Sequence, residues 1–175
     1  HLEPDAGCHR LRDGLMLAAP SLQNEYTLCF SGDPALDLPA LPAEDDPGHA
    51  AAVAAREIKL KNARETGNWP IKPGETPTIF RFKPVGGSAV RWWSGQSQRE
   101  SLSALEDIEL MFRLALVGVD GLPGVTMQHD KRGKFPLVTV ATMDQIYASG
   151  AGPAAVVELG AYIAERSLGG VPPLS

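Results

Sequence analysis

The stretch that decides the fold runs from residue 78 to residue 85 and reads Thr-Ile-Phe-Arg-Phe-Lys-Pro-Val. Phe80 and Phe82 alternate with Arg81 and Lys83, which is the period of two that a β-strand imposes. One face of such a strand is apolar and the other is charged. Because a sheet with one buried and one solvated face is usually antiparallel, the segment predicts an antiparallel sheet.

Further strands are expected around this one. Tyr26, Leu28 and Phe30 alternate with polar or small residues, which predicts a strand over residues 25–30. The glycines at 86 and 87 predict a turn, so residues 89–93 are expected to form a strand that makes a hairpin with 78–85. The apolar run at 135–140 predicts another short strand.

Two long helices are predicted at residues 49–66 and 97–117. The first has Asp46 as a plausible N-cap, Pro47 at the first helical position, and Gly67 as the left-handed residue that ends it. The second carries an apolar stripe at helical spacing. The stripe consists of Leu102, Leu105, Ile108, Met111, Phe112, Ala115 and Leu116.

Shorter helices complete the prediction, which is an α+β fold with a small antiparallel sheet and long loops rich in proline and glycine. Thr142 and Gln145 have the spacing of a capping box, so a short helix is expected through Tyr147. A last helix is expected at 153–167. The segments 33–47 and 125–134 are expected to be loops, and the chain divides into an N-terminal arm, 1–24, and one domain, 25–175.

The charge of the chain limits its partners. The 175 residues carry a formal net charge of −5, which disfavours binding to a polyanion. Acidic residues gather between 32 and 46, and basic residues exceed acidic ones between 56 and 83. Either these are two solvated faces, or they are complementary patches that let copies or partners dock head to tail.

The two cysteines, Cys8 and Cys29, do not make a disulfide framework. Cys29 lies between two apolar residues of the predicted strand 25–30, which suits a small buried side chain. A disulfide between the two cysteines is possible, and so are two thiols. No apolar run approaches the ~20 residues of a membrane span, so no membrane partner is expected.

Motifs for cofactors and metals are weak. Gly150, Gly152 and Ala155 imitate a dinucleotide-binding fingerprint, but a short predicted helix precedes them where the fingerprint needs a strand. Neither paired histidines at i,i+4 nor a Cys-x-x-Cys pattern occurs in the sequence. We therefore expect neither a cofactor nor a metal.

Catalytic patterns have simpler structural explanations. The sequence contains no Gly-x-Ser-x-Gly elbow, and His129 falls in a charged segment where a solvated side chain is the normal interpretation. Glu106 and Glu109 are three residues apart on an amphipathic helix, which is typical of a solvated face rather than a glycosidase pair. An enzyme would need a site gathered from unrelated positions, such as His129 or His49 with a carboxylate.

Features that suit contact with other chains are better represented. The arm 1–24 and the proline-rich loop 33–47 can order on a neighbour. If 89–93 is a strand, adjacent tryptophans place one ring on each face, and an exposed tryptophan is a typical binding anchor. The candidate partner-binding residues are Asp33, Asp37, Asp45, Asp46, Arg81, Lys83, Trp92 and Trp93.

Two segments carry a family resemblance. Asn68-Trp69-Pro70 and then Pro73-Gly74-Glu75-Thr76-Pro77-Thr78-Ile79-Phe80 precede a Glu-rich amphipathic helix, and Glu158-Leu159-Gly160-Ala161-Tyr162-Ile163 with Ser167-Leu168 lie near the end. In these features the chain resembles small proteins encoded in the structural modules of tailed bacteriophages. The resemblance covers roughly residues 68–168 and leaves 1–30 unexplained. It implies a role in the virion or its assembly, and no catalytic residues.

The sequence thus favours a bacteriophage structural or assembly protein, such as a capsid-associated, neck or tail component. It would be a non-enzyme that contacts other phage proteins or copies of itself, in the virion or in the host cytoplasm during assembly. One alternative is an enzyme with a dispersed site. The other is a single-stranded nucleic-acid-binding module, because Arg81, Lys83, Arg91, Trp92 and Trp93 mix basic and aromatic side chains.

Overall fold

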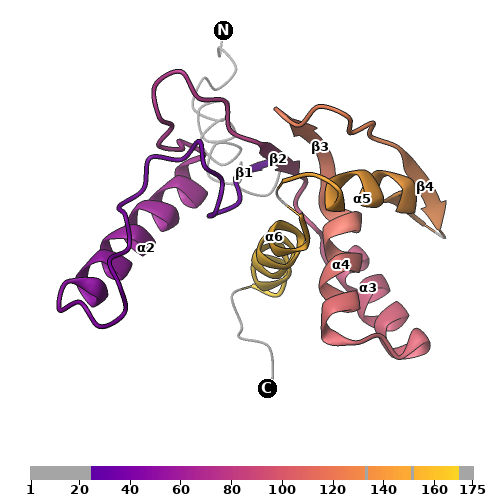
Figure 1. Ribbon diagram of the computed structural model, residues 1–175. Coiled ribbons are helices and arrows are strands. Elements are labelled where there is room, and N and C mark those ends of the chain that lie inside the picture. Colours follow the sequence, from indigo (N-terminus) through magenta and orange to yellow (C-terminus); the bar gives the residue numbers. More distant parts are fainter. Residues whose placement is uncertain (1–24, 133, 151, 170–175) are drawn as a thin grey trace, which may run out of the picture.

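The computed structural model describes residues 25–132, 134–150 and 152–169 (Figure 1). Its elements follow in the order β1 (Tyr26–Leu28), α2 (His49–Thr66), β2 (Ile79–Phe82), α3 (Gly87–Glu100), α4 (Ala104–Ala115), β3 (Leu116–Asp120), β4 (His129–Arg132), β5 (Phe135–Val138), α5 (Val140–Tyr147) and α6 (Gly152–Ser167). Helices combined with two small antiparallel sheets make this an α+β fold, as the sequence predicts. The predicted arm 1–24, with Cys8, lies outside the described residues.

The first sheet has β2 at its centre, between β1 and β3, and all pairs are antiparallel. Phe80 and Phe82 are fully buried, while Arg81 on the opposite face pairs with the Asp120 carboxylate at 3.0 Å. The alternation predicted from the sequence is therefore confirmed. The strand is shorter than the predicted 78–85, and its pairing with β3 shifts register between Arg81 and Phe82.

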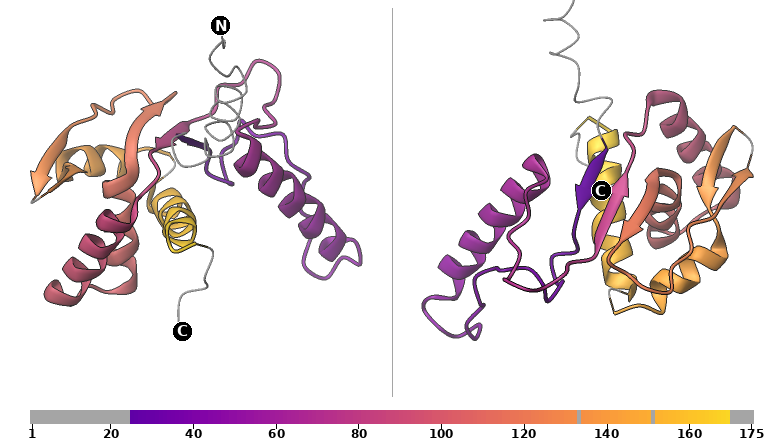
Figure 2. Two further views of the ribbon diagram at one scale, coloured as in Figure 1. Left: turned by 180° about the vertical axis from the view of Figure 1, so that it is seen from behind. Right: turned by 90° about the horizontal axis from the view of Figure 1, so that it is seen from above.

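The core lies against the apolar face of this sheet, where α4 and α6 pack on it and on each other (Figures 1 and 2). The rings of Phe80 and Phe82 meet the edge of Phe112 from α4, with centroids 6.0 and 5.3 Å away. Edge-to-face aromatic pairs of this kind add about 0.5–1.5 kcal/mol each to the burial of the rings. These contacts fix the position of α4 against the sheet.

The predicted strand at 89–93 is wrong, because these residues belong to α3. Ala89, Trp92 and Trp93 share one helical face and contact the core, which is the spacing of a helix rather than a strand. Gly86 is extended and acts as the N-cap, so the two glycines begin a helix instead of turning a hairpin.

The predicted helix 97–117 is also wrong in its bounds. Residues 97–100 finish α3, the chain turns at Ser101 with a φ of 50°, and α4 begins at Ala104. Ser103 and Glu106 form a reciprocal capping box at the start of α4. Each side chain accepts a hydrogen bond from the backbone amide of the other residue, so two amides of the helix N-terminus have partners. Beyond α4 the chain passes directly into β3, so the apolar residues after 115 belong to the sheet.

The segment 125–134 is not simply a loop, because its second half forms β4 and pairs with β5 in a two-stranded hairpin. The predicted strand 135–140 is correspondingly shorter and ends at Val138. Thr139, rather than Thr142, is the N-cap of α5, and its hydroxyl accepts a hydrogen bond from the Thr142 amide. The buried Thr142 hydroxyl instead donates to the carbonyl of Thr126 at 2.7 Å, which holds the hairpin to α5.

The first long helix has the predicted bounds, His49–Thr66, and ends at Gly67 with the expected left-handed φ of 73°. Its N-cap is Gly48 instead of Asp46, and Pro47 lies outside the helix. The Asp46 carboxylate caps the preceding turn by accepting the Gly48 amide at 2.7 Å. The loop 33–47 contains no helix or paired strand, and one isolated bridge joins Leu36 to Ile71.

Candidate protein-binding surface

Helix α2 extends away from the rest of the fold (Figures 1 and 2). Of its eighteen residues, all of which the structure describes, only Leu60 and Ala63 are buried. A globular surface helix normally buries a wide stripe of its side chains against a core. Most of the surface of α2 is therefore available to another molecule.

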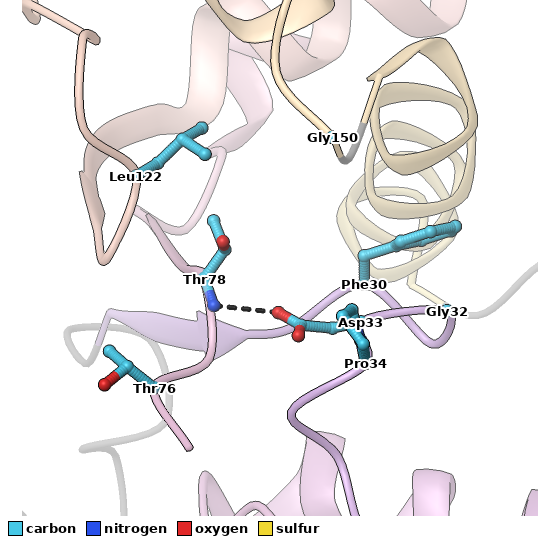
Figure 3. A pocket seen from close by; sticks show the side chains of 8 residues that line it. All are labelled: Phe30, Gly32, Asp33, Pro34, Thr76, Thr78, Leu122 and Gly150. Carbon is cyan, nitrogen blue, oxygen red and sulfur yellow. Dashed lines mark hydrogen bonds between the residues drawn. The ribbon is translucent and has the colours of Figure 1, made fainter.

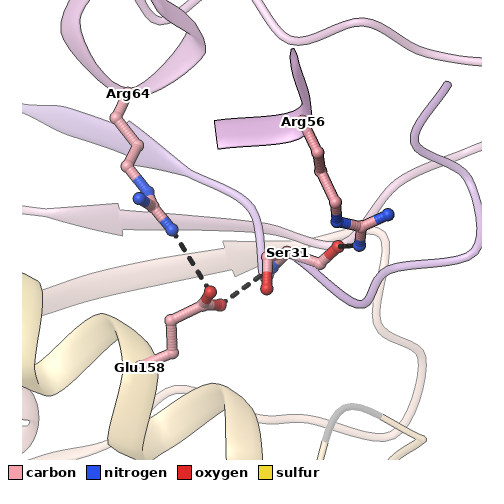
Figure 4. A network of polar contacts seen from close by, with 4 residues as sticks. All are labelled: Ser31, Arg56, Arg64 and Glu158. Carbon is pink, nitrogen blue, oxygen red and sulfur yellow. Dashed lines mark hydrogen bonds and ion pairs between the residues drawn. The ribbon is translucent and has the colours of Figure 1, made fainter. Parts of the chain in front are cut away.

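A polar network anchors α2 to the fold (Figure 4). The Arg56 guanidinium donates to the carbonyl of Ser31 at 2.8 Å, and the Ser31 amide donates to Glu158 of α6 at 2.8 Å. The other oxygen of Glu158 accepts from Arg64 at 3.2 Å, in a pair whose side chains are 19 % and 25 % exposed. Arg56 and Arg64 thus fix the direction of α2, the first through the backbone at Ser31 and the second through the carboxylate of Glu158.

We call the side of α2 that points away from these anchors the α2 outer face. It consists of Ala51, Ala54, Ala55 and Ile58, all exposed. Ile58 is 64 % exposed, and the exposed residues Glu57, Lys59, Lys61 and Glu65 lie around it. The face therefore presents one bulky apolar side chain on a small-residue surface, with charges of both signs near it.

A groove with an apolar lining lies between α4 and α6, with a volume of about 340 Å³. We call it the α4–α6 groove. Its lining residues are Trp93, Ala104, Asp107, Ile108, Ala161, Ala164, Glu165 and Leu168. Leu168 is 37 % exposed, so part of this apolar surface faces solvent.

Helices α4 and α6 touch closely at Gly160, which precedes the groove-lining Ala161. At Gly160 a Cβ atom would lie 2.8 Å from the carbonyl oxygen of Ile108, so only glycine lets the helices meet there. The second side of the crossing holds another apolar hollow of about 350 Å³, where Leu105 is 63 % exposed beside Val157. A close crossing thus leaves apolar surface open on both of its sides.

Two carboxylates give the α4–α6 groove its charge. Glu165 stands at its rim on α6, and Asp107 lies in its wall in the first turn of α4. Oδ1 of Asp107 is buried and accepts no hydrogen bond from any residue in the described part of the chain. A buried oxygen without a donor costs about 1–3 kcal/mol or more.

Trp92 and Trp93 have different neighbours in the structure. Trp93 forms part of the groove wall, and its indole N–H donates to the carbonyl of Asp107 at 2.9 Å. Trp92 packs against Phe135 of β5 with ring centroids 5.8 Å apart. Trp93 is thus at a candidate contact surface, whereas Trp92 connects α3 to the hairpin.

The predicted acidic residues stay in the loop before α2. Asp33 lines a separate hollow of about 250 Å³ (Figure 3), where its two oxygens accept the amides of Ala35 at 2.9 Å and Thr78 at 2.8 Å. Asp37 and Asp45 are exposed. Asp33 and Asp46 both hold backbone turns in place, so their carboxylates already have donors.

Of the predicted basic residues, Arg81 lies in β2 and Lys83 follows the strand. Arg81 is held between Asp120, at 3.0 Å, and Glu25, at 3.7 Å. Lys83 is half-buried, and its backbone amide donates to the carbonyl of Ala115. The eight predicted contact residues are therefore spread over the loop, the sheet and α3 rather than gathered at one site.

Burial is the main cause of the raised pKa values of Cys29 and Tyr147. Burial, together with the nearby Asp33 charge, raises the pKa of the Cys29 thiol to about 12, so it stays protonated at neutral pH. Burial and the hydrogen bond to Glu109 raise the pKa of Tyr147 well above its usual value. Cys29 is a buried thiol, as its position in the sequence indicates.

In residues 25–132, 134–150 and 152–169, no three His, Cys, Asp or Glu side chains group closely enough to hold a metal ion. None of the helices within those ranges combines the length and the hydropathy needed to cross a bilayer.

Sequence reasoning missed the main residues of both surfaces, namely Ile58, Asp107, Ile108 and Ala161. In the sequence Ala161, Ala164 and Leu168 have the spacing of a helix core stripe, and nothing local says that the stripe is left open. Comparison of the chain with protein-family models, with curated proteins and with solved structures finds no match.

Proposed function

We propose that this chain is a structural or assembly protein of a bacteriophage particle that acts through protein–protein contacts. The observation that carries the proposal is α2, an 18-residue helix anchored at one side and open over most of its surface. Helices in globular proteins gain most of their stability from packing an apolar face. A helix that projects with an exposed Ile58 is suited to pack on another chain.

The α4–α6 groove supports the same proposal. Its lining is mostly apolar, and an exposed apolar surface with a polar rim is typical of an interaction site. The bacteriophage context rests on the resemblance of residues 68–168 to structural-module proteins. The contact role rests on α2 and the groove, so the two parts of the proposal have separate support.

The proposal can be tested on the particles that are released by cells encoding the chain. After induction, antibodies against the chain are used on purified particles and on precursor assemblies separated by density gradient. A structural protein is expected in both fractions, and an assembly factor in the precursors alone. A chain absent from both fractions and monomeric in light scattering at all concentrations would overturn the proposal.

A further inference from the structure

We infer that the hollow containing Asp33 binds a lysine side chain of a partner protein. We call it the Asp33 hollow, and its walls include Phe30, Asp33, Thr78 and Leu122 (Figure 3). The inference rests on the proposed contact role and gives the chemistry of one contact. It does not depend on the α4–α6 groove or on α2.

The Asp33 hollow lies at one end of the first sheet. Strand β1 ends before Phe30, β2 begins after Thr78 and β3 ends before Leu122, and the antiparallel pairing brings these three points together. A Cβ at Gly32 would lie 2.6 Å from Cε1 of Phe30, so glycine lets the ring close against the turn that carries Asp33. The hollow is therefore part of the folded sheet and exists without a ligand.

Two amide hydrogen bonds hold the Asp33 carboxylate in one orientation. Oδ1 accepts from the Ala35 amide at 2.9 Å, and Oδ2 accepts from the Thr78 amide at 2.8 Å. A carboxylate can accept about four hydrogen bonds, so acceptor positions remain for a ligand. Within the described part of the chain, no Lys, Arg or His forms an ion pair with Asp33. The hollow thus holds an oriented negative charge to which those residues supply no cation.

The rest of the lining suits the carbon chain of a lysine. Phe30, Pro34 and Leu122 supply apolar surface, and lysine packs its methylene groups on such surface while its ammonium group reaches a polar partner. The volume of about 250 Å³ is below the roughly 300–1,000 Å³ of sites that take small molecules and cofactors. A single side chain is therefore the ligand that fits.

Other charges near the hollow do not change its sign. Glu75 is exposed in the loop that leads to β2, and it adds negative charge. Arg56 reaches the turn before Asp33, but its guanidinium donates to the carbonyl of Ser31 at 2.8 Å. The N-terminus of α6, which begins beyond Gly150, carries a partial charge of about +0.5, and this is smaller than the full charge inside the hollow.

Lysine fits the carboxylate better than arginine does. A guanidinium pairs most strongly when it meets both oxygens of a carboxylate with two parallel hydrogen bonds. Both oxygens of Asp33 already accept an amide, which leaves less room for this arrangement. An ammonium group acts as a point charge and needs only one free acceptor position.

NMR titration of the full chain with four probes tests the inference. The probes are Nα-acetyl-lysine methylamide, its arginine and norleucine counterparts, and butylamine. The lysine probe should shift the amide signals of Ala35 and Thr78 with a dissociation constant in the millimolar range. The norleucine probe keeps the carbon chain without the charge, so it should bind about tenfold more weakly or less. The arginine probe should also bind more weakly than the lysine probe.

Three variants locate the binding. Asp33→Asn should remove the difference between the lysine and norleucine probes. Asp46→Asn is the matched control, because Asp46 also accepts a backbone amide, from Gly48 at 2.7 Å, but does not line the hollow. Leu122→Trp should fill the hollow and block the lysine probe while both amide bonds of Asp33 stay in place. Urea unfolding shows that each variant is folded.

Four results would overturn the inference. They are equal binding of the lysine and norleucine probes, tighter binding of the arginine probe, binding of butylamine without binding of the lysine probe, and a Leu122→Trp or Asp33→Asn protein that binds the lysine probe as wild type does. Each of them leaves the proposed function in place if the chain is found in particles or precursors, because that test does not involve the hollow.

Discussion

The crossing of α4 and α6 depends on Gly160, and replacing it by alanine should destabilise the protein. A Cβ at this position would lie 2.8 Å from the carbonyl oxygen of Ile108 and 2.7 Å from its Cγ2. Both distances are at least about 0.7 Å shorter than the roughly 3.5 Å at which such atoms attract. The Ile108 side chain can rotate, but its carbonyl oxygen is fixed in α4, so the helices themselves must separate.

The magnitude follows from two opposing effects. Overpacking a core costs about 1–3 kcal/mol, and a clash with backbone belongs to the upper part of that range. Alanine in a helix interior recovers about 1 kcal/mol relative to glycine. We therefore expect Gly160→Ala to lower the free energy of unfolding by about 1–2 kcal/mol, and the melting temperature by about 2–8 °C.

Gly95→Ala is the matched control, because it makes the same change inside α3. A Cβ there would meet only the Arg99 side chain, at 3.7 Å, so nothing opposes the gain in helix propensity. Urea unfolding followed by circular dichroism should show a lower midpoint for Gly160→Ala and a higher one for Gly95→Ala, with equal slopes. A Gly160→Ala protein as stable as wild type would refute the claim that these helices meet in backbone contact.

Three further predictions follow from the core and the anchors. Phe112→Ala should cost about 3–5 kcal/mol in urea unfolding, because it empties the centre of the aromatic cluster. Glu158→Gln removes the charge that holds Arg64 and weakens the acceptor for Ser31, so α2 amides should lose hydrogen-exchange protection equivalent to about 1–2 kcal/mol while α4 amides do not. In a Cys8→Ala background the Cys29 thiol should react with a thiol reagent only on unfolding. Because folding raises its pKa from 9.0 to about 12, the stability it contributes is complete below pH 9 and is lost as pH rises toward 12, so the urea midpoint of wild type should fall more steeply in that window than that of Cys29→Ala.

The sequence predicts the secondary structure correctly in segments where the signal for one type of element dominates. The alternation of Phe80 and Phe82 with charged residues has no helical interpretation, and the strand is found there. The bounds of α2 follow from its alanine-rich composition and from Gly67. Local signals are sufficient in these segments because tertiary packing agrees with them.

The errors arise where two local signals compete. Five residues, 89–93, are too few to distinguish the period of two of a strand from the period of 3.6 of a helix. Two adjacent tryptophans are compatible with both kinds of element. The apolar stripe from 102 to 116 hides the serine at 103, whose capping box with Glu106 begins a new helix. In β4 every residue from His129 to Arg132 is charged or polar, so its strand character comes from pairing with β5 rather than from its own composition.

The candidate surfaces were beyond sequence reasoning for a different reason. An apolar residue at helical spacing is read as core, and only the tertiary structure shows which stripe is covered. Ile58 on α2 and Leu159 on α6 look alike in the sequence, yet Ile58 is 64 % exposed and Leu159 is 1 % exposed. Exposure of this kind depends on where α2 is anchored, and the anchors Ser31 and Glu158 are 127 residues apart.

The composition of α2 explains how it can project without a partner and still be a helix. Isolated helices of its length are marginal in water, but alanine has the highest intrinsic helix propensity. Five of the first seven residues of α2 are alanine, so the projecting half retains helical structure with few contacts. Alanine side chains also bury little surface, so this half gains little by folding back onto its own chain. A sequence selected only for the stability of the single chain would place larger apolar residues there. We expect that Ala51→Leu and Ala55→Leu would leave the urea midpoint nearly unchanged, because both side chains are exposed on α2 and contact no core.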